Sequence, residues 1–259
     1  MRPVTLITGA SAGIGTALAR VFAQHGHELV FVARREQRLA ELANSIAARG
    51  HKRPLIMPID LAEPDAVERI GDLLTMYDVE PDIVVNNAGC GLVGAAAEID
   101  LDEQLAMVDL NVRALTDLSL AFVEPLQRHK GGILNVASVA GFLPGPGMAV
   151  YYATKAYVVS FSEALHRELA PRGVRVTALC PGPVPSEFQA RAGVRSERYP
   201  RFFTQSAERV AEDGYRGLAA GRRLVVPGFA NKLVPALLRL APRRLQLALV
   251  DARNRRRHP

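Results

Sequence analysis

The amino-acid sequence predicts an α/β fold, a doubly wound and mostly parallel sheet of about seven strands with helices on both faces. Short apolar, β-branched runs alternate along the chain with longer stretches whose apolar residues recur at helical spacing. Polar residues and a turn fall directly after several of these runs, at the sheet edge where such folds bind their ligands. These residues are Asp60, Asn86, Asn87, Ser138 and the turn Pro181-Gly182.

The expected strands are runs rich in valine, isoleucine and leucine that are bounded by turn residues. They are Val4–Thr8, Glu28–Ala33, Leu55–Ile59, Ile83–Asn86, Gly132–Ala137, Val174–Leu179 and Leu224–Val226. Helical periodicity between them predicts helices over Gly13–His25, Arg35–Arg49, Glu63–Tyr77, Leu101–Arg128 and Tyr151–Arg172. This alternation is typical of a parallel sheet.

The composition is that of an ordinary globular protein, with 49% hydrophobic and 22% charged residues. Strand-like sequence begins at residue 4, and no apolar stretch approaches the ~20 residues of a membrane-spanning helix, so the chain is expected to be soluble and cytoplasmic. Cys90 and Cys180 lack the spacing of metal ligands and are expected to be buried thiols. The six histidines are scattered, and no metal site is expected.

A glycine-rich segment, Thr8–Gly15, connects the first expected strand to the first expected helix. Glycines at this junction let the backbone pass close to a pyrophosphate, whose charge is met by free amide groups and by the positive end of the helix. The segment therefore predicts a dinucleotide site. A plain turn is the alternative, because short glycine motifs are common.

Tyr151 and Lys155 lie four residues apart on an expected helix and so share one face of it. A free tyrosine titrates near ~10, and lowering its pKa by ~3 units takes about 4 kcal/mol. A positive charge at ~4 Å supplies about that much at an effective dielectric constant of ~20. The pair is thus suited to proton transfer at neutral pH. The alternative is a core tyrosine beside a solvated lysine, and Tyr152 meets the same spacing criterion.

Together these motifs resemble those of the classical short-chain dehydrogenase/reductase family, over about residues 4 to 188. The matching motifs are Thr8–Gly15, Asp60-Leu61, Asn86-Asn87-Ala88-Gly89, Asn111, Ser138, Tyr151-x-x-x-Lys155 and Pro181-Gly182-Pro183-Val184. The resemblance implies one Rossmann-type oxidoreductase domain over residues 1–259 and a nicotinamide cofactor. It also selects Tyr151 over Tyr152 as the general acid/base.

The resemblance implies roles for the other motif residues. Ser138 would hydrogen-bond the substrate oxygen and stabilise its developing charge, with a turn or cap serine as the alternative. Asn111 would support a water-mediated proton relay to Lys155, or else bond a neighbouring backbone turn. Asp60 would accept from the adenine amino group, or else cap the next helix. The residues implied to contact the cofactor are Gly9, Ser11, Ala12, Gly13, Ile14, Gly15, Asp60, Leu61, Asn87, Ala88, Gly89, Tyr151, Lys155, Pro181, Gly182, Val184 and Ser186.

Charge after the second expected strand favours NADP(H) over NAD(H). Proteins that select NAD carry a carboxylate about 20 residues past the glycine motif, on the ribose 2′-hydroxyl. This chain has Ala33 there, followed by Arg34, Arg35 and Arg38. A guanidinium is a bidentate partner for a 2′-phosphate, and an anion would offset the unfavourable placement of cations at a helix start. A solvated basic helix start is the alternative.

After Pro181 the sequence is less regular, and residues 183–222 match the family's variable substrate lid. Aromatic residues and prolines alternate there with arginines, and the apolar groups are expected to cover the substrate. These residues are Pro183, Pro185, Phe188, Tyr199, Phe202, Phe203, Arg191, Arg195, Arg198 and Arg201.

Residues 228–259 form a basic amphipathic extension with eight Lys/Arg against one acid, Asp251. Its interleaved leucines are Leu233, Leu237, Leu238, Leu240, Leu245, Leu247 and Leu249. One interpretation is peripheral contact with anionic lipid. We expect instead that the extension packs on its own protein, over the substrate cleft or at a subunit interface. Nucleic-acid binding is not expected, because basic charge without a recognition fold is weak support for it.

The expected function is NADP(H)-dependent interconversion of a carbonyl and a primary or secondary alcohol on a small molecule. A catalytically silent NADP(H)-binding regulator of the same fold is the alternative. Such a regulator has no physical need for the complete set of Asn111, Ser138, Tyr151 and Lys155. The resemblance further implies a homodimer or homotetramer formed through the helices near residues 101–128 and 151–172.

Overall fold

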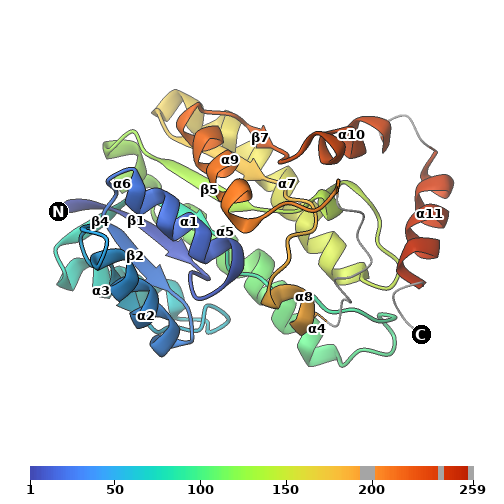
Figure 1. Ribbon diagram of the computed structural model, residues 1–259, viewed down its shortest axis with the longest axis horizontal. Coiled ribbons are helices and arrows are strands. Elements are labelled where there is room, and N and C mark those ends of the chain that lie inside the picture. The colour runs from blue at the N-terminus through green and yellow to red at the C-terminus, as the bar shows by residue number, and fades with distance from the viewer. Residues whose placement is uncertain (193–201, 239–241, 256–259) are drawn as a thin grey trace.

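The computed structural model describes residues 1–192, 202–238 and 242–255, and its described residues form one parallel sheet covered by helices (Figure 1). The strand order is β3-β2-β1-β4-β5-β6-β7, and every neighbouring pair is parallel. The strands are β1 (Arg2–Thr8), β2 (Leu29–Val32), β3 (Leu55–Met57), β4 (Val79–Asn86), β5 (Gly132–Val136), β6 (Arg175–Leu179) and β7 (Leu224–Val225). Each coincides with a strand expected from the sequence, so the predicted fold class is confirmed.

The helices agree with the expected ones up to β6, with two local departures. They are α1 (Gly13–Gln24), α2 (Glu36–Ala47), α3 (Ala66–Met76), α4 (Leu101–Val108), the π-turn η1 (Asp109–Arg113), α5 (Ala114–Ala121), α6 (Val123–Arg128), the 3₁₀ turn η2 (Val139–Phe142), α7 (Ala149–Leu169) and the 3₁₀ turn η3 (Ala170–Arg172). The single helix expected over Leu101–Arg128 widens into the π-turn η1 and breaks at Phe122. Pro125 explains the break, because it cannot donate a backbone hydrogen bond to the preceding turn.

Alternate side chains along each strand enter different cores, because strand side chains point to opposite faces in turn. Ile7 of β1 packs with Leu18 of α1 and with residues of α2 and α9. Its neighbour Leu6 packs with Leu118 of α5 and with residues of α3 and α7. All four of these side chains are fully buried or nearly so. The sheet is therefore covered on both faces, as a doubly wound sheet requires.

In the described part of the chain after β6, four helices were not resolved individually by the sequence pattern: α8 (Glu187–Arg191), α9 (Ala207–Ala219), α10 (Phe229–Leu238) and α11 (Arg243–Arg255). Of these, α9 packs against α1, about 190 residues earlier in the chain. The Tyr215 ring stacks on His25 with ring centroids 4.0 Å apart and meets Phe22 edge-on at 5.0 Å. The last part of the chain thus completes the core that the first helix begins.

Two features were searched for in the described part of the chain: a membrane-spanning helix and a cluster of metal ligands. Within it, no helix combines the length and apolarity needed to cross a bilayer. Within the same residues, no group of three or more His, Cys, Asp or Glu side chains is arranged to hold a metal ion.

Candidate functional site

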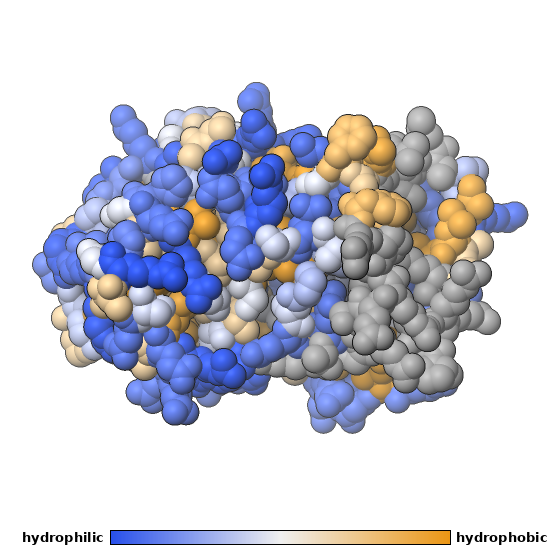
Figure 2. Space-filling view, viewed as in Figure 1, coloured by the Kyte–Doolittle hydropathy of each residue, from blue (hydrophilic) through white to orange (hydrophobic). Residues whose placement is uncertain are grey.

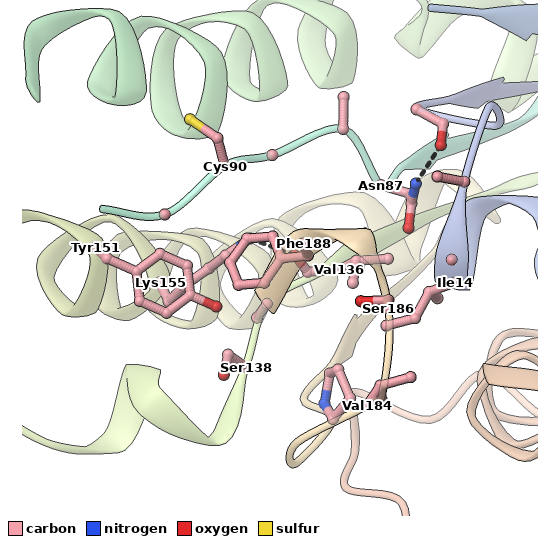
Figure 3. Close-up of a pocket in the computed structure, with 18 of the residues that line it drawn as sticks. Ile14, Asn87, Cys90, Val136, Ser138, Tyr151, Lys155, Val184, Ser186 and Phe188 are labelled. Atoms are coloured by element: carbon pink, nitrogen blue, oxygen red, sulfur yellow. Dashed lines mark hydrogen bonds between the residues drawn. The ribbon is translucent and has the colours of Figure 1, made fainter. Parts of the chain in front are cut away.

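A cavity of about 510 Å³ lies at the carboxyl ends of the strands, and most of the predicted site residues line it (Figure 3). The predicted residues on its wall are Gly9, Ser11, Ala12, Gly13, Ile14, Arg34, Arg35, Asp60, Leu61, Asn87, Ala88, Gly89, Ser138, Tyr151, Lys155, Pro181, Gly182, Val184 and Ser186. Gly15, Arg38 and Asn111 are not on the wall. The sheet edge therefore brings together residues from six strand ends and two helices.

The glycine-rich loop between β1 and α1 is shaped to hold an anion. Gly9 and Gly13 have φ values of +65° and +55°, which side-chain-bearing residues rarely adopt. The first helical turn of α1 has no side-chain cap at Ala12 and no acidic residue, so its amides remain available to a ligand. Gly15 faces inward instead: a Cβ there would stand 2.2 Å from the Gly9 carbonyl oxygen. Its role is close packing of the loop on the helix.

Thr8 and Asn87 fasten this loop to the end of β4. The Thr8 hydroxyl accepts from the Asn87 and Ala88 amides, both at 3.0 Å, and donates to the Val85 carbonyl at 3.2 Å. The Asn87 side-chain amide donates to the Thr8 and Gly9 carbonyls at 2.9 and 3.2 Å. The donors of Asn87 are therefore engaged within the protein. Thr8 belongs to the predicted glycine-rich motif, but this fastening role of its hydroxyl was not predicted from the sequence.

Asn86 belongs to a buried polar chain rather than to the cavity wall. Its side-chain amide donates to Asn135 Oδ1 of β5 and to Ser119 Oγ of α5, both at 2.9 Å. Asn135 in turn donates to Ser162 Oγ of α7 at 2.9 Å. These hydrogen bonds connect strands β4 and β5 to helices α5 and α7. Predicted catalytic residues lie on α7 and directly before α5.

Lys155 is almost fully buried on α7, and its ammonium donates to the Val136 carbonyl at the end of β5 at 2.9 Å. Burial lowers the pKa of Lys155 to about 8, because the charged form loses its hydration. The amine therefore remains mostly protonated at neutral pH. A Cβ on Gly89 would stand 3.5 Å from Nζ, so the absence of a side chain at Gly89 keeps the amine open to the cavity.

Tyr151 and Ser138 present their hydroxyl groups to the same part of the cavity (Figure 3). Ser138 also caps the turn η2, because its Oγ accepts from the Ala140 amide at 3.1 Å. The cap fixes the serine side chain and leaves its own proton free to donate. The ring of Tyr152 lines the cavity too, but it packs on Gly145, where a Cβ would come within 2.2 Å of the ring.

Asn111 is buried in the π-turn, and its side chain is bonded to protein atoms at both ends. Nδ2 donates to the Cys90 carbonyl at 2.9 Å and to Thr154 Oγ1 at 3.1 Å. Oδ1 accepts from the Cys90 amide at 3.0 Å. These partners are not a neighbouring backbone turn, because Cys90 lies 21 residues away and Thr154 bonds through its side chain. The water-mediated relay to Lys155 stays a prediction.

The two cysteines differ in exposure. Cys180 is fully buried, whereas Cys90 is partly exposed and lines the cavity, so the expectation of two buried thiols is wrong for Cys90. Burial raises the pKa of both thiols, and both are therefore protonated at neutral pH.

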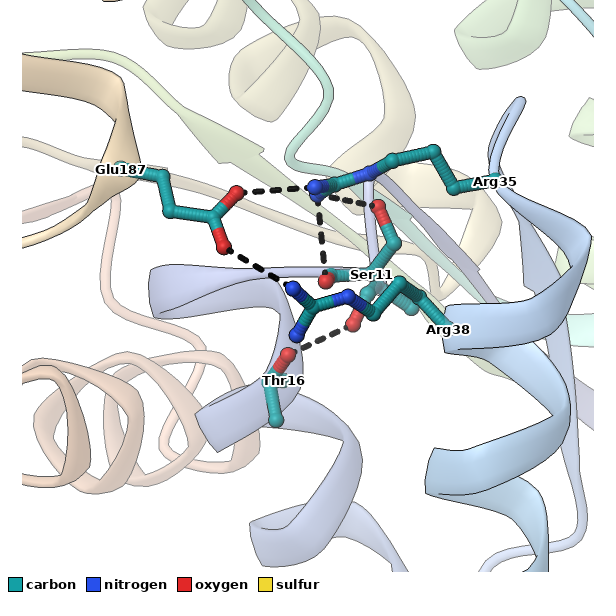
Figure 4. A network of polar contacts seen from close by, with 6 residues as sticks. Ser11, Thr16, Arg35, Arg38 and Glu187 are labelled. Atoms are coloured by element: carbon teal, nitrogen blue, oxygen red, sulfur yellow. Dashed lines mark hydrogen bonds and ion pairs between the residues drawn. The ribbon is translucent and has the colours of Figure 1, made fainter. Parts of the chain in front are cut away.

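The basic residues after β2 all have acidic partners. Arg34 pairs with Asp60 at 3.4 Å, and Asp60 also accepts from the Ala62 amide at 3.0 Å. Asp60 does not cap α3, whose N-cap position is Asp65. Arg35 pairs with Glu187 of α8 at 2.9 Å and donates to Ser11 (Figure 4). Glu187 was not among the predicted site residues, because nothing in the local sequence connects positions 35 and 187.

Segments after β6 close the other end of the cavity. Phe188 lies beside Tyr151 with ring centroids 5.6 Å apart, and Phe203 also lines the wall. Asn231 of α10 donates to the Phe203 and Pro227 carbonyls at 3.1 and 3.0 Å. Asn231 also packs against Gly182: a Cβ on Gly182 would come within 2.4 Å of the side-chain amide nitrogen of Asn231. Sequence reasoning missed Asn231.

The extension over residues 228–259 packs on the cavity wall at its described end. Asn254 of α11 donates to the Pro146 carbonyl at 2.7 Å, and Val250 joins the cluster that contains Met148 and Tyr151. The opposite side of α11 exposes Leu245 and other leucines. The predicted lid residues Arg195, Arg198, Tyr199 and Arg201, together with Leu240 of the extension, lie outside the described residues. The side chains of Arg191, Leu237 and Leu238 are likewise not described.

Three comparisons place this architecture among known proteins. The family model described as short chain dehydrogenase matches residues 3–196. The chain is 38% identical over 191 residues to Sulfoacetaldehyde reductase 2 of Chromohalobacter salexigens, covering 73% of this chain and 75% of that protein. A short-chain dehydrogenase from Sphingobium yanoikuyae, solved in complex with NADPH, superposes with a TM-score of 0.81 at 31% identity, over 92% of this chain and 94% of that one. The bulky-bulky ketone specific alcohol dehydrogenase from Comamonas testosteroni gives a TM-score of 0.76 at 30% identity, over 93% of both chains.

Proposed function

Since the chain belongs to the short-chain dehydrogenase family, we propose that it interconverts a carbonyl and an alcohol with NADP(H), using Tyr151 as general acid/base. Membership itself makes the protein an oxidoreductase that acts on CH–OH or carbonyl groups with a nicotinamide cofactor. The preference for NADP(H), the substrate and the residue roles are the proposal. One observation carries it: Tyr151, Ser138 and Lys155 line the same cavity as an anion-binding glycine loop.

The residues present fit a dinucleotide. The left-handed Gly9 and Gly13 and the uncapped amides of α1 form a cradle for a pyrophosphate, and Leu61 and Ala88 line the adjoining wall. When bound, the nicotinamide supplies or accepts the hydride. The residues of the chain transfer the proton and bind the oxygen of the substrate carbonyl or alcohol.

In the direction of reduction, the Tyr151 hydroxyl donates its proton to the carbonyl oxygen while Ser138 holds that oxygen by a hydrogen bond. In the direction of oxidation, the tyrosinate takes the alcohol proton. In this proposal the protonated Lys155 favours the charged form of the tyrosine. Positioned acids and bases of this kind contribute about 10²- to 10⁴-fold to a rate.

The preference for NADP(H) rests on charge at the adenosine end of the cavity. Ala33 stands where NAD-selecting proteins carry a carboxylate, and Arg34 and Arg35 line the wall beside it. The complex of the Sphingobium protein with NADPH is consistent with this choice. The test is kcat/KM with NADPH and with NADH, for wild type and for Ala33→Asp combined with Arg34→Ser. A wild-type preference for NADH contradicts the charge argument.

The substrate end of the cavity favours an apolar carbonyl or alcohol. Among the described residues, its wall consists mainly of Cys90, Leu143, Met148, Tyr152 and Phe188. Gln189 adds a buried Oε1 that has no hydrogen-bond partner among the described residues, an acceptor suited to a ligand donor. A panel of aliphatic, aromatic and sulfonated carbonyls followed by nicotinamide absorbance tests both activity and class. Tight NADPH binding without turnover of any substrate would favour the silent regulator.

We also propose a homo-oligomer built on the outer faces of α4, α5 and α7. Large apolar side chains are exposed there on neighbouring helices, which a monomer rarely tolerates as a continuous patch. They are Leu101, Leu105, Val108, Leu120 and Tyr157. Light scattering on wild type and on Leu105→Glu, which places a charge in the patch, tests the proposal. A monomeric wild type contradicts it.

A further inference from the structure

We infer that Glu187 is an internal competitor of the cofactor's 2′-phosphate, held by Arg35 and Arg38 until that phosphate displaces it. The inference rests on the proposed use of NADP(H). It assigns a specificity-determining role to a residue in the segment after β6, whereas the arginines themselves come from the segment after β2 (Figure 4).

The geometry places a carboxylate in an anion site. Arg35 Nη1 lies 2.9 Å from Glu187 Oε2, and Arg38 Nη2 lies 3.9 Å from Glu187 Oε1. Through Nη2, Arg35 also donates to the Ser11 hydroxyl and carbonyl oxygens, at 3.1 and 3.2 Å. The guanidinium of Arg35 is thus fixed between the glycine-rich loop and α8. A phosphate on the ribose needs the same guanidinium edge, because bidentate pairing uses both terminal nitrogens.

The contact is accessible enough to be exchanged. The side chains of Arg35 and Glu187 are 34% and 43% exposed, and both line the cavity. Ion pairs with this exposure are weak, because water screens them and two long side chains must be held in place. A 2′-phosphate carries more negative charge than a carboxylate and is therefore expected to win the guanidinium.

Displacement of Glu187 has a consequence for the catalytic end. Glu187 is followed by Phe188, whose ring lies 5.6 Å from that of Tyr151. A Cβ on Gly91 would stand 2.8 Å from Phe188 Cζ, so this ring is closely packed across the cavity. Release of Glu187 from Arg35 therefore removes an ion pair from the residue next to the ring that covers Tyr151. NAD(H), which lacks the 2′-phosphate, does not compete with Glu187 for this guanidinium.

The test compares Glu187→Gln with Glu36→Gln in binding to adenosine 2′,5′-bisphosphate and to 5′-AMP, which differ only in the 2′-phosphate. Glu36 is an exposed carboxylate in the first turn of α2, so its replacement removes the same charge from the same neighbourhood. Dissociation constants are measured by calorimetry, at low and at high salt, and thermal unfolding confirms that each variant is folded.

We expect Glu187→Gln to bind adenosine 2′,5′-bisphosphate about two- to fivefold more tightly than wild type, with 5′-AMP unchanged. The gain should shrink at high salt, because exposed charges are screened there. Glu36→Gln should show a smaller gain. Unchanged or weaker binding of the bisphosphate by Glu187→Gln overturns the inference, and so does an equal gain for 5′-AMP.

Arg35→Ala separates this inference from the proposed cofactor preference. If Arg35→Ala weakens bisphosphate binding but Glu187→Gln does not improve it, the inference fails and the preference for NADP(H) stands. If Arg35→Ala leaves bisphosphate binding unchanged, Arg35 is not the phosphate partner. The inference then fails, and the preference for NADP(H) is decided by the test on Ala33 and Arg34.

Discussion

The part of the chain up to the end of β6 and the part that follows it build the same cavity by different means. In the first part, backbone geometry does most of the work: left-handed glycines, uncapped helix amides and strand ends bonded by Thr8 and Asn87. In the second part, the contacts that shape the cavity come from single side chains, two of which reach back to the first part. Glu187 meets Arg35, Asn231 meets the Phe203 carbonyl beside Gly182, and Asn254 meets the Pro146 carbonyl.

This difference indicates that the two parts of the chain serve different ligands. A cradle made of backbone atoms keeps the same binding groups when most neighbouring side chains are replaced, so it suits a cofactor that stays the same. Contacts made by single side chains change with each substitution, so they suit a substrate end that differs between related enzymes. Substitutions in the glycine-rich loop should therefore affect stability and nucleotide binding, and substitutions of Asn231 and Asn254 should affect substrate handling. Glu187 is the exception in the second part, because it meets Arg35 at the nucleotide end.

The largest effect is expected from Tyr151→Phe. Loss of the hydroxyl should lower kcat by about 10²- to 10⁴-fold and leave the Kd for NADPH nearly unchanged, because the proton is needed only in the reaction. Steady-state kinetics and nucleotide titration measure both quantities. Tyr152→Phe is the matched control and should keep most of the rate. The reverse result would move the catalytic role to Tyr152.

A second prediction concerns the buried amine of Lys155. Its pKa of about 8 in the folded protein lies below the ordinary 10.5, so the unfolded chain binds more protons between these two values. The free energy of unfolding should therefore rise with pH across this window and stay flat below it, by about 3 kcal/mol in all. Chemical denaturation of wild type at pH 7 and 10.5, each relative to Lys155→Met, isolates this group. Equal differences at the two pH values would contradict the burial of a charged amine.

Gly15→Ala tests the backbone cradle. The added Cβ would meet the Gly9 carbonyl oxygen at 2.2 Å, so the loop must move. We expect a loss of about 1–3 kcal/mol in the free energy of unfolding, together with weaker NADPH binding. Gly71→Ala is the control, because a Cβ there meets nothing within 4 Å and the residue lies inside α3. It should stabilise the protein by up to about 1 kcal/mol.

The smallest effect is expected from Asn254→Ala on α11. Removal of its bond to the Pro146 carbonyl should cost about 1 kcal/mol of stability and raise the KM for the carbonyl substrate. The Kd for NADPH should not change, because the contact lies at the substrate end. Asn44→Ala, an exposed asparagine on α2, should change neither constant. A change in NADPH affinity with Asn254→Ala would contradict the assignment of Asn254 to the substrate end of the cavity.

The sequence predicted the first part of the fold well, because its determinants are local. Alternation of apolar runs located all seven strands, and helical periodicity located the helices up to α7 to within a few residues. It did not locate the break at Phe122 or the π-turn around Asn111, where the amide bonds Cys90 about 20 residues away. Hydrophobic periodicity reports only on neighbouring residues, so it does not reveal such contacts.

The same reason explains what was missed in the site. Residues on strand ends and on the glycine-rich loop were found because their place in the chain determines their place at the sheet edge. Glu187, Asn231 and Asn254 are placed by contacts with distant segments. The partners of Arg34 and Arg35, likewise, became visible only in the folded chain.

The packing of α9 on α1 has a consequence for how the protein is made. Phe22 on α1 is fully buried, and part of its cover is Tyr215, about 190 residues later. At ~5–20 residues per second, a ribosome needs roughly 10 to 40 s to synthesise that interval. During this time the apolar face of α1 has no permanent partner from the C-terminal segment. A nascent chain of this protein is thus expected to engage holding chaperones until α9 emerges, and ribosome-bound chains that stop before Ala207 should remain sensitive to protease.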